Sequence, residues 1–188
     1  MTAHLPGLHI CLEGPDHAGK TTQATRLAKR LHDATGQHVR VQAFPTDTPL
    51  GHKARAATPS QAQPLFRADY TRAWDDYLTP WIKTGRHVIT DRGMLSGQAY
   101  GNTPPASLPT PTLTLILHTP NHVLDSRSEP ADHWETGPVQ ARARAFYATT
   151  TQGIHIDATG TPDEVEERIW AIVAPTAAEW TRLAGATR

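Results

Sequence analysis

The sequence predicts an α/β fold in which helices cover both faces of a parallel sheet. Short apolar runs alternate along the chain with longer segments whose apolar residues recur at helical spacing. Strands that are joined through helices connect by right-handed crossovers, and this alternation therefore produces a parallel sheet. The length of 188 residues is that of one ordinary domain, which can bury a core without a disulfide or a structural metal.

Each expected strand is a short apolar run that is bounded by turn or breaker residues. The first run ends at Glu13-Gly14, and the second is stopped by Pro45, which cannot donate to a sheet ladder. The five expected strands span 8–12, 39–44, 87–90, 113–117 and 154–156.

The expected helices are longer, and each carries one apolar stripe. In the first helix Ala24, Leu27 and Leu31 recur at helical spacing, and Gly36 follows as a stop signal. Pro80 is expected to kink the second helix near its end. The expected helices span 20–35, 65–83, 136–151 and 162–174, whereas 52–63 is read as weakly structured and 102–112 as a loop.

The charge balance and the cysteine count exclude several classes of protein. Lys and Arg number 18, as do Asp and Glu, and the net charge of +0 argues against a strongly basic nucleic-acid binder. No apolar run approaches the roughly 18 residues of a membrane span, and the first residues lack the pattern of a signal peptide. Cys11 is the one cysteine and the 11 histidines are scattered, so we expect a cytoplasmic protein without a disulfide or a metal-ligand cluster.

A glycine-rich phosphate-binding loop stands between the first expected strand and the first expected helix. Residues 14–21 read Gly-Pro-Asp-His-Ala-Gly-Lys-Thr and match the pattern G-x-x-x-x-G-K-[ST]. Gly14 and Gly19 allow backbone N–H groups to wrap around a polyphosphate. Lys20 carries a positive charge to the β- and γ-phosphates, and Thr21 offers its hydroxyl to Mg²⁺. The motif predicts binding of a nucleoside triphosphate, either by an enzyme or by a non-catalytic nucleotide-binding regulator.

The third expected strand ends in Asp91-Arg92, a pair that is typical of small-molecule kinases. Such an Asp holds a magnesium-bound water, and such an Arg grips the transferred or the acceptor phosphate. A GTPase would need Asn-Lys-x-Asp, but neither Asn102 nor Asn121 is followed by Lys. The two motifs together predict a P-loop kinase, which is a phosphotransferase.

Four stretches of the chain resemble the thymidylate kinase family. They are the phosphate loop 13–23, the motif Phe-Pro-Thr-Asp-Thr-Pro-Leu-Gly at 44–51, the segment Leu-Phe-Arg-Ala-Asp-Tyr at 65–70, and the Asp-Arg block 85–100. The resemblance implies a three-layer α/β/α sandwich with a five-stranded parallel sheet, the P-loop kinase fold, in a single domain. It also implies ATP and Mg²⁺ as cofactors and a pyrimidine deoxynucleotide, dTMP or a 5-modified dUMP, as phosphate acceptor.

The resemblance implies roles for individual residues as well. Asp16 would face the acceptor sugar, Lys20 and Arg92 would hold the transferred phosphoryl group, and Thr21 and Asp91 would hold the metal. The residues implied in ATP binding are Gly14, Pro15, Asp16, His17, Ala18, Gly19, Lys20, Thr21, Thr22 and Arg127, the last at the start of a lid near 127–136. The residues implied on the acceptor side are Phe44, Pro45, Asp47, Phe66, Tyr70, Arg92, Ser96 and Tyr100.

Three positions on the acceptor side depart from the family pattern. Tyr70 stands where the family has an Arg that reads the thymine carbonyl, and Gly93 stands where the family has an aromatic residue. Asp47 places a carboxylate in the loop after the second strand, where it would repel a phosphate dianion. The same carboxylate could act as the general base for a hydroxyl acceptor.

These departures leave a second function open, that of a kinase acting on the hydroxyl of 5-hydroxymethyluracil in DNA, as in phage DNA modification. A base in a duplex would then have to be flipped into the site. The loop 102–112 also replaces a helix that is often part of the family's dimer interface, so that either a monomer or a homodimer is expected.

Overall fold

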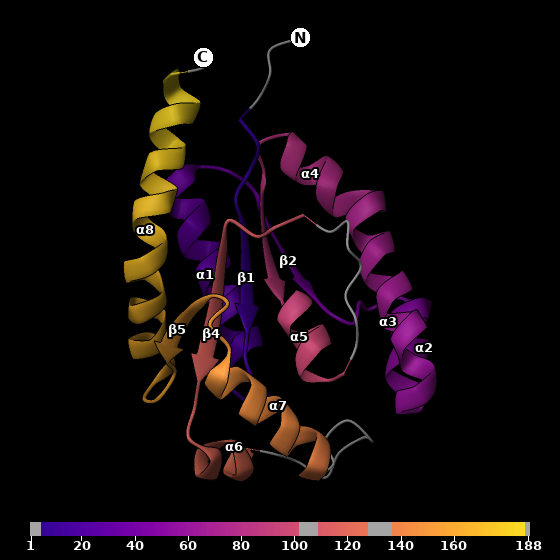
Figure 1. The fold of residues 1–188 in the computed structure, drawn as a ribbon. Coiled ribbons are helices and arrows are strands. Elements are labelled where there is room, and N and C mark those ends of the chain that lie inside the picture. The colour runs from indigo at the N-terminus through magenta and orange to yellow at the C-terminus, as the bar shows by residue number, and fades with distance from the viewer. Residues whose placement is uncertain (1–4, 102–108, 128–136, 187–188) are drawn as a thin grey trace.

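A five-stranded parallel sheet forms the centre of the computed structural model, which describes residues 5–101, 109–127 and 137–186 (Figure 1). All five predicted strands are confirmed, and each predicted end lies within one residue of the observed end. The strands are β1 (His9–Glu13), β2 (Val39–Ala43), β3 (His87–Asp91), β4 (Leu113–His118) and β5 (Ile154–Asp157). They lie in the order β2-β3-β1-β4-β5.

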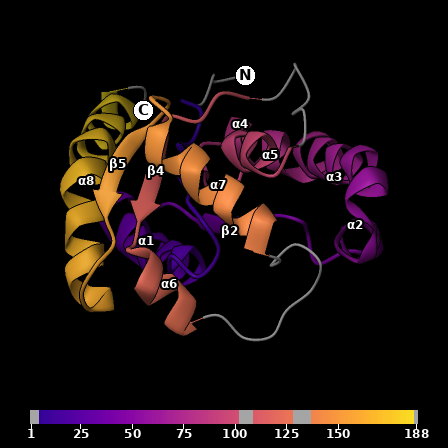
Figure 2. The same cartoon turned by 60° about the horizontal axis from the view of Figure 1, so that its bottom comes forward.

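The register of the sheet brings the ends of its central strands together at one edge. β1 pairs with β3 and β4, so that Leu12 lies opposite Asp91 on one side and Leu115 on the other. The strand arrows point towards this edge in Figure 1, and Figure 2 turns it towards the viewer. Open α/β sheets bind their ligands at the carboxyl ends of the strands. The phosphate loop follows β1 at this edge, so the site is expected there.

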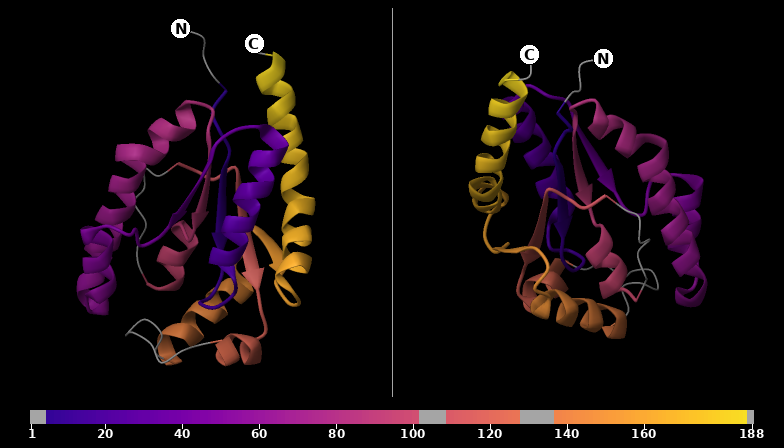
Figure 3. Two further views of the ribbon diagram at one scale, coloured as in Figure 1. Left: turned by 180° about the vertical axis from the view of Figure 1, so that it is seen from behind. Right: turned by 45° about the horizontal axis from the view of Figure 1, so that its top comes forward.

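Helices α1 (Lys20–Thr35) and α8 (Pro162–Ala186) lie side by side over one face of the sheet, as Figure 3 shows from behind. Leu27 of α1 and Ile169 of α8 are fully buried in one apolar cluster with Leu115 of β4. Burial of such a side chain contributes about 1.5–3 kcal/mol. This cluster therefore holds α1 and α8 on the sheet. The bounds of α1 are those that the sequence predicts.

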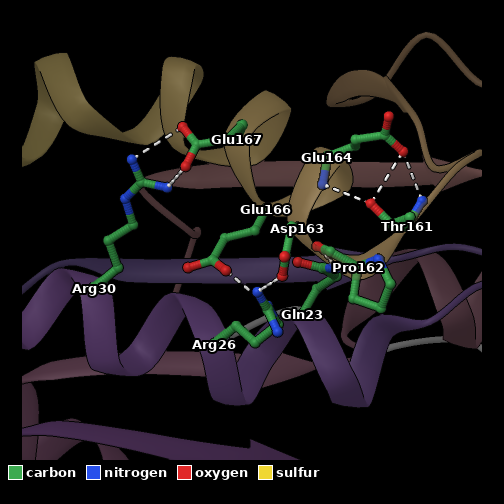
Figure 4. Close-up of polar contacts among 9 residues, drawn as sticks. All are labelled: Gln23, Arg26, Arg30, Thr161, Pro162, Asp163, Glu164, Glu166 and Glu167. Carbon is green, nitrogen blue, oxygen red and sulfur yellow. Dashed lines mark hydrogen bonds and ion pairs between the residues drawn. The ribbon is translucent and has the colours of Figure 1, made fainter.

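An ion pair and a capping box fix the start of α8 beside α1 (Figure 4). Arg26 Nε donates to Glu166 at 2.6 Å. Thr161 N donates to Glu164 Oε2 at 2.7 Å, and Glu164 N donates to Thr161 Oγ1 at 3.3 Å, which satisfies two end groups of the helix. Exposed ion pairs stabilise by only about 0–1 kcal/mol, so these contacts orient the helices more than they hold them together.

The opposite face of the sheet carries a long helical segment and further helices. Trp74, Leu78 and Val88 form one apolar cluster there, and Ile116 packs with Tyr147 in another. The helices of the two faces complete the predicted three-layer α/β/α sandwich. The elements of this face are α3 (Pro59–Ala73), the π-helical turn η1 (Trp74–Leu78), α4 (Thr79–Lys83), α5 (Met94–Ala99) and α7 (Gly137–Thr149).

The expectation of weak structure over 52–63 is wrong. Helix α2 (Pro49–Ala56) covers its first part, and α3 begins within its second part. Thr48 Oγ1 accepts a hydrogen bond from Gly51 N at 3.2 Å and caps α2, and Pro49 stands in the first turn, where proline is tolerated. Thr48 and Pro49 therefore serve as the helix-start signals of α2.

The helix predicted over 65–83 extends back to Pro59 and includes a π-helical turn. This turn, η1, lies immediately before α4, and Pro80 stands in the first turn of α4. Because proline lacks an N–H and crowds the preceding turn, a locally wider helix accommodates it. The structure thus has a π-helical turn before Pro80, where the sequence predicts a kink.

Helix α8 continues past the predicted end at residue 174, with Pro175 inside it. Its apolar stripe continues through Ala177 and Trp180, which are both buried, and Trp180 Nε1 donates to Pro6 O at 2.7 Å. The burial of this stripe offsets the backbone hydrogen bond that Pro175 cannot donate.

Besides α2, the structure adds two further short helices that the sequence did not indicate, α5 and α6 (Asn121–Arg127). Residues 109–112 have no regular helix or strand, as expected, and 102–108 lie outside the described residues. Within the described ranges, no helix combines the length and the apolar character that crossing a membrane requires.

Candidate functional site

The phosphate loop runs from the end of β1 to the start of α1 and passes close to β4. Gly14 has a φ of 139°, and a Cβ atom on it would lie 2.7 Å from the carbonyl oxygen of Leu117, so that only glycine fits there. His17 has a φ of 65°. This left-handed conformation costs a non-glycine residue about 1–3 kcal/mol and is typical of binding sites. The loop is thus held in one specific shape.

Lys20 is buried at the first position of α1, and its ammonium group donates to the Pro15 carbonyl oxygen at 2.7 Å. Burial lowers the pKa of Lys20, while the charges of Asp91 and Glu13 act in the opposite direction. A neutral carbonyl is a weaker partner for a buried ammonium group than a phosphate oxygen is. Lys20 is therefore well placed to bind an anion in the loop.

Thr21 and Asp91 meet at the carboxyl edge of the sheet. Thr21 Oγ1 donates to Asp91 Oδ2 at 2.5 Å. The second carboxylate oxygen, Asp91 Oδ1, is buried and has no hydrogen-bond partner among the described residues. A hydroxyl beside a carboxylate with a spare oxygen is a donor set that suits Mg²⁺ and its bound waters. The two residues fit the ion that accompanies a nucleoside triphosphate.

The Asp16 carboxylate receives donors from three side chains. Its Oδ1 contacts the guanidinium of Arg92, and its Oδ2 accepts from Tyr100 Oη at 2.6 Å and from Gln140 Nε2 at 2.7 Å. The guanidinium carbon of Arg92 lies 5.1 Å from the centre of the Tyr100 ring, and Arg92 also donates to Ser96 Oγ at 3.3 Å. A guanidinium, a carboxylate and a phenol thus stand beside the phosphate loop, where they can bind a phosphate and a hydroxyl group.

A second carboxylate, Glu13, supports the start of α5, which begins two residues after Arg92. Glu13 is fully buried, and its Oε1 accepts from the backbone N–H groups of Leu95 and Ser96 at 3.0 and 3.2 Å. Its Oε2 accepts from Ser96 Oγ at 2.6 Å and from Tyr147 Oη at 2.8 Å. A buried carboxylate is tolerated when its oxygens are satisfied in this way. Glu13 therefore joins β1, α5 and α7 behind the site.

The loop after β2 lies on the predicted acceptor side and carries Phe44 and Pro45. Asp69, a buried residue of α3, accepts from Thr46 N at 2.8 Å and so fixes this loop to the helix. The rings of Phe44 and Tyr70 lie 4.1 Å apart. Two of the residues predicted for the acceptor side are thus in direct contact.

Asp47 lies apart from the Asp16 and Arg92 side chains. Its carboxylate is 99% exposed and pairs with His52 Nε2 at 2.6 Å. The contacts of the described residues thus join Asp47 to the outer side of α2, and they do not bring it to Arg92. Phe66, another residue predicted for the acceptor side, is half-buried on α3.

The remaining residues predicted for the ATP side lie along the phosphate loop and at the end of α6. Ala18 is buried in the loop, and Thr22 is exposed on α1. Arg127 Nη1 donates to the carbonyl oxygen of His17 at 3.3 Å, which brings this arginine to the loop as expected. The rest of the predicted lid, 128–136, lies outside the described residues.

Sequence reasoning missed three polar residues of this region, Glu13, Gln140 and Tyr147. The signal for Glu13 was a carboxylate at the end of an apolar run, directly before the phosphate loop. Gln140 contacts a residue 124 positions away and Tyr147 one 134 positions away, and nothing in the local pattern of α7 indicates these partners.

Known proteins resemble this chain over most of its length. The family model described as thymidylate kinase matches residues 12–169. The curated thymidylate kinase of Deinococcus radiodurans is 32% identical over 202 residues, covering 89% of this chain and 97% of that protein. The thymidylate kinase of Xanthomonas euvesicatoria is 33% identical over 202 residues, covering 95% of this chain and 88% of that protein.

A solved structure supports the fold. The thymidylate kinase of Candida albicans superimposes with a TM-score of 0.77 at 22% identity, over 91% of this chain and 92% of that chain. The sequence relatives and the phosphate loop together identify a P-loop phosphotransferase. The chain belongs to the thymidylate kinase family.

Proposed function

We propose that the protein is a thymidylate kinase, which transfers the γ-phosphoryl group of ATP to dTMP and releases dTDP and ADP. The observation that carries this proposal is the contact between Asp16 of the phosphate loop and Arg92 at the end of β3. This contact sets an anion-binding loop beside a second phosphate-binding group, which is the arrangement that positions a donor and an acceptor phosphate. The curated relatives support the choice of dTMP, since both are thymidylate kinases.

The ATP side of the site would act through positioning and charge. Lys20 would exchange its contact with the Pro15 carbonyl for the β- and γ-phosphates. Thr21 and Asp91 would hold Mg²⁺ through the hydroxyl and through bound water. The ion supplies neutralisation of the charge on the phosphates. Arg127, at the end of α6, would approach the nucleotide from the side of His17.

The acceptor side would use the residues that surround the Asp16 carboxylate. Arg92 would bind the acceptor phosphate through its guanidinium, which can donate two parallel hydrogen bonds. Asp16 and Tyr100 would hold a hydroxyl of the deoxyribose. An oxygen of the acceptor phosphate forms the new bond to the γ-phosphorus while the bond to the bridging oxygen of ADP breaks. A phosphate dianion carries no proton at the attacking oxygen, so this transfer needs no general base.

The alternative acceptor, a hydroxyl of 5-hydroxymethyluracil in DNA, has less support. A hydroxyl must lose a proton during transfer, and Asp47 is the base that the sequence offers. The Asp47 carboxylate is 99% exposed and pairs with His52, which favours a phosphate acceptor over a hydroxyl acceptor. A non-catalytic regulator is also disfavoured, because Lys20, Thr21 and Asp91 are all present.

The proposal is tested by measuring ADP release from Mg-ATP with a panel of acceptors. The panel contains dTMP, dUMP, 5-hydroxymethyl-dUMP, thymidine, and DNA with and without 5-hydroxymethyluracil. We expect turnover with dTMP, at least about 100-fold slower turnover in Arg92→Ala, and little change in the exposed control Arg86→Ala. Turnover with hydroxymethylated DNA but not with any free nucleotide would refute the proposal.

A further inference from the structure

Helix α5 is preceded by a residue that has no side chain to cap it. Gly93 stands at the position where Ser, Thr, Asp or Asn would usually accept a hydrogen bond from the first turn. The first backbone N–H groups of a helix have no partner within the helix, and they are costly to bury without one. Leu95 and Ser96, in the first turn of α5, are both buried. Their N–H groups therefore need an acceptor from another part of the chain.

Glu13, at the end of β1, supplies this acceptor, although it stands 82 positions before Leu95. Its Oε1 accepts from Leu95 N at 3.0 Å and from Ser96 N at 3.2 Å, as a capping side chain does within a helix. Its Oε2 accepts from Ser96 Oγ at 2.6 Å and from Tyr147 Oη at 2.8 Å. Because Glu13 is fully buried, water does not take the place of these contacts.

The turn before α5 carries Arg92 in a conformation that needs support. Arg92 has a φ of 76°, and a non-glycine residue keeps this left-handed conformation only where its surroundings hold it. Its backbone N–H donates to Leu12 O at 2.9 Å, directly before Glu13 in the sequence. Its Nη1 donates to Ser96 Oγ at 3.3 Å, and this hydroxyl in turn donates to Glu13. The turn is thus held between the end of β1 and the first turn of α5.

We propose that Glu13 is a positioning residue, which caps α5 from β1 and thereby sets the turn that directs the Arg92 guanidinium towards Asp16. The hydrogen bonds of the side chain, and hence its length, decide this role, whereas its charge does not. The effect on phosphoryl transfer rests on the proposed function, but the capping of α5 does not.

Two substitutions separate the hydrogen bonds of Glu13 from its charge. Gln keeps the length and loses the charge. Its carbonyl oxygen can accept from the N–H groups of Leu95 and Ser96, and its amide can donate to the hydroxyl oxygens of Ser96 and Tyr147. Asp keeps the charge but is shorter by one methylene group, so it cannot reach both N–H groups at hydrogen-bonding distance. We therefore expect Glu13→Gln to resemble the parental protein and Glu13→Asp to differ from it.

The cap is measured by amide hydrogen exchange, followed by NMR at Leu95 and Ser96. We expect exchange at both amides to be at least about tenfold faster in Glu13→Asp than in the parental protein, and to change less than about threefold in Glu13→Gln. The control is Trp180→Phe, which removes a hydrogen bond to Pro6 O, before the start of β1, and so weakens the fold without touching the cap. It should not speed exchange at these two amides more than at other buried amides.

The positioning of Arg92 is measured by steady-state kinetics with dTMP and ATP varied in turn. A small misplacement of a binding group lowers the rate strongly, so we expect Glu13→Asp to lower kcat/KM for dTMP about 10- to 100-fold. The KM for ATP should change less than about threefold, a split that a general loss of stability would not produce. In Glu13→Gln and in Trp180→Phe, kcat/KM for dTMP should stay within about threefold of the parental value.

A loss of kcat/KM of about tenfold or more in Glu13→Gln, or exchange about tenfold faster at Leu95 and Ser96 in that variant, would overturn the proposal, because the charge would then decide. Unchanged exchange at these amides in Glu13→Asp, or an unchanged kcat/KM for dTMP, would overturn it as well. If the parental protein turns over no nucleotide, the proposed function fails, while the exchange measurement still decides whether Glu13 caps α5.

Discussion

Gln140 donates a hydrogen bond from its side-chain amide to Asp16 Oδ2 at 2.7 Å, and this bond joins helix α7 to the phosphate loop. The same oxygen accepts from Tyr100 Oη at 2.6 Å, and the other carboxylate oxygen contacts Arg92. The carboxylate is thus fixed by groups from three separate parts of the chain. Because α7 follows the predicted lid, the bond gives that helix a direct connection to the acceptor side of the site.

Replacement of Gln140 by Leu should weaken acceptor binding. A hydrogen bond to a charged group contributes about 1.5–3 kcal/mol, so kcat/KM for dTMP should fall roughly 10- to 100-fold in Gln140→Leu. The KM for ATP should change much less, since the amide contacts Asp16 and not Lys20. Steady-state kinetics with each substrate varied in turn measures both values. The exposed Gln152→Leu is the control, and equal effects of the two substitutions would contradict this role.

Removal of the Thr21 hydroxyl should raise the Mg²⁺ concentration that the enzyme needs. Thr21 Oγ1 donates to Asp91 Oδ2 at 2.5 Å, and both groups would hold the ion. We expect Thr21→Val to lower kcat about 100-fold at low Mg²⁺, with partial recovery at high Mg²⁺. The control is Thr25→Val, one turn further along α1, whose hydroxyl donates to the Thr21 carbonyl. A Mg²⁺ dependence in Thr21→Val identical to that of the parental protein would argue against a metal site here.

Replacement of Tyr147 by Phe should destabilise the fold. Tyr147 is fully buried, and its hydroxyl donates to Glu13 Oε2 at 2.8 Å. Without this donor the buried carboxylate loses a partner, at a cost of about 1–3 kcal/mol in the free energy of unfolding. Urea denaturation measures this cost. Tyr77→Phe, which removes a more exposed hydroxyl from a bond with Gln42, is the matched control and should cost less than about 1 kcal/mol.

Stability should fall as the pH decreases below about 6.5, in part because of His87. This histidine is fully buried, and its Nδ1 accepts a hydrogen bond from Leu8 N at 2.9 Å. Protonation of Nδ1 would set its N–H group against the N–H group of Leu8, and this bond would be lost. Burial lowers the pKa of His87 from 6.5 to about 4. Between these values the unfolded chain binds the proton and the folded protein does not, so stability is lost as the pH falls through this window.

The expected slope from one such group is about 1.4 kcal/mol per pH unit. Urea denaturation between pH 4 and 7.5 should show that His87→Gln loses this part of the slope, whereas the exposed control His52→Gln keeps it. A slope in His87→Gln equal to that of the parental protein would mean that other groups carry the pH dependence.

The sheet could be predicted because its signals are local. The strands around Ile10 and Ile89 are short apolar runs with glycine, proline or charged residues directly beyond them. The end of α8 could not be predicted in this way. Pro175 is a local stop signal, and the burial of Trp180 against Pro6 that overrides it depends on the packed core.

In the candidate site, too, the parts with local sequence signals could be predicted and the parts that depend on distant contacts could not. The ATP side could be predicted because Gly14, Lys20 and Thr21 stand in one contiguous motif and Asp91 stands at the end of the third strand of the pattern. The supporting contacts of Gln140 could not, since they cross between distant parts of the chain. For the acceptor side, composition alone could not show which way the side chains of the loop after β2 would point.

The outward direction of Asp47 is one such case. The sequence offered a carboxylate beside Phe44-Pro45, and the general-base hypothesis followed from its chemistry. Its pairing with His52 on α2 depends on a helix that the sequence did not indicate. A second case is Tyr70, whose ring contact with Phe44 is visible only once the fold brings the loop after β2 against α3.

The central claim, transfer of a phosphoryl group from ATP to dTMP, is tested most directly by following the nucleotides themselves. The parental protein and Lys20→Ala are incubated with Mg-ATP and dTMP, and ATP, ADP, dTMP and dTDP are separated by chromatography over time. We expect equal amounts of dTDP and ADP from the parental protein, and formation at least about 100-fold slower in Lys20→Ala. Release of ADP without dTDP, or undiminished formation of dTDP in Lys20→Ala, would contradict the claim.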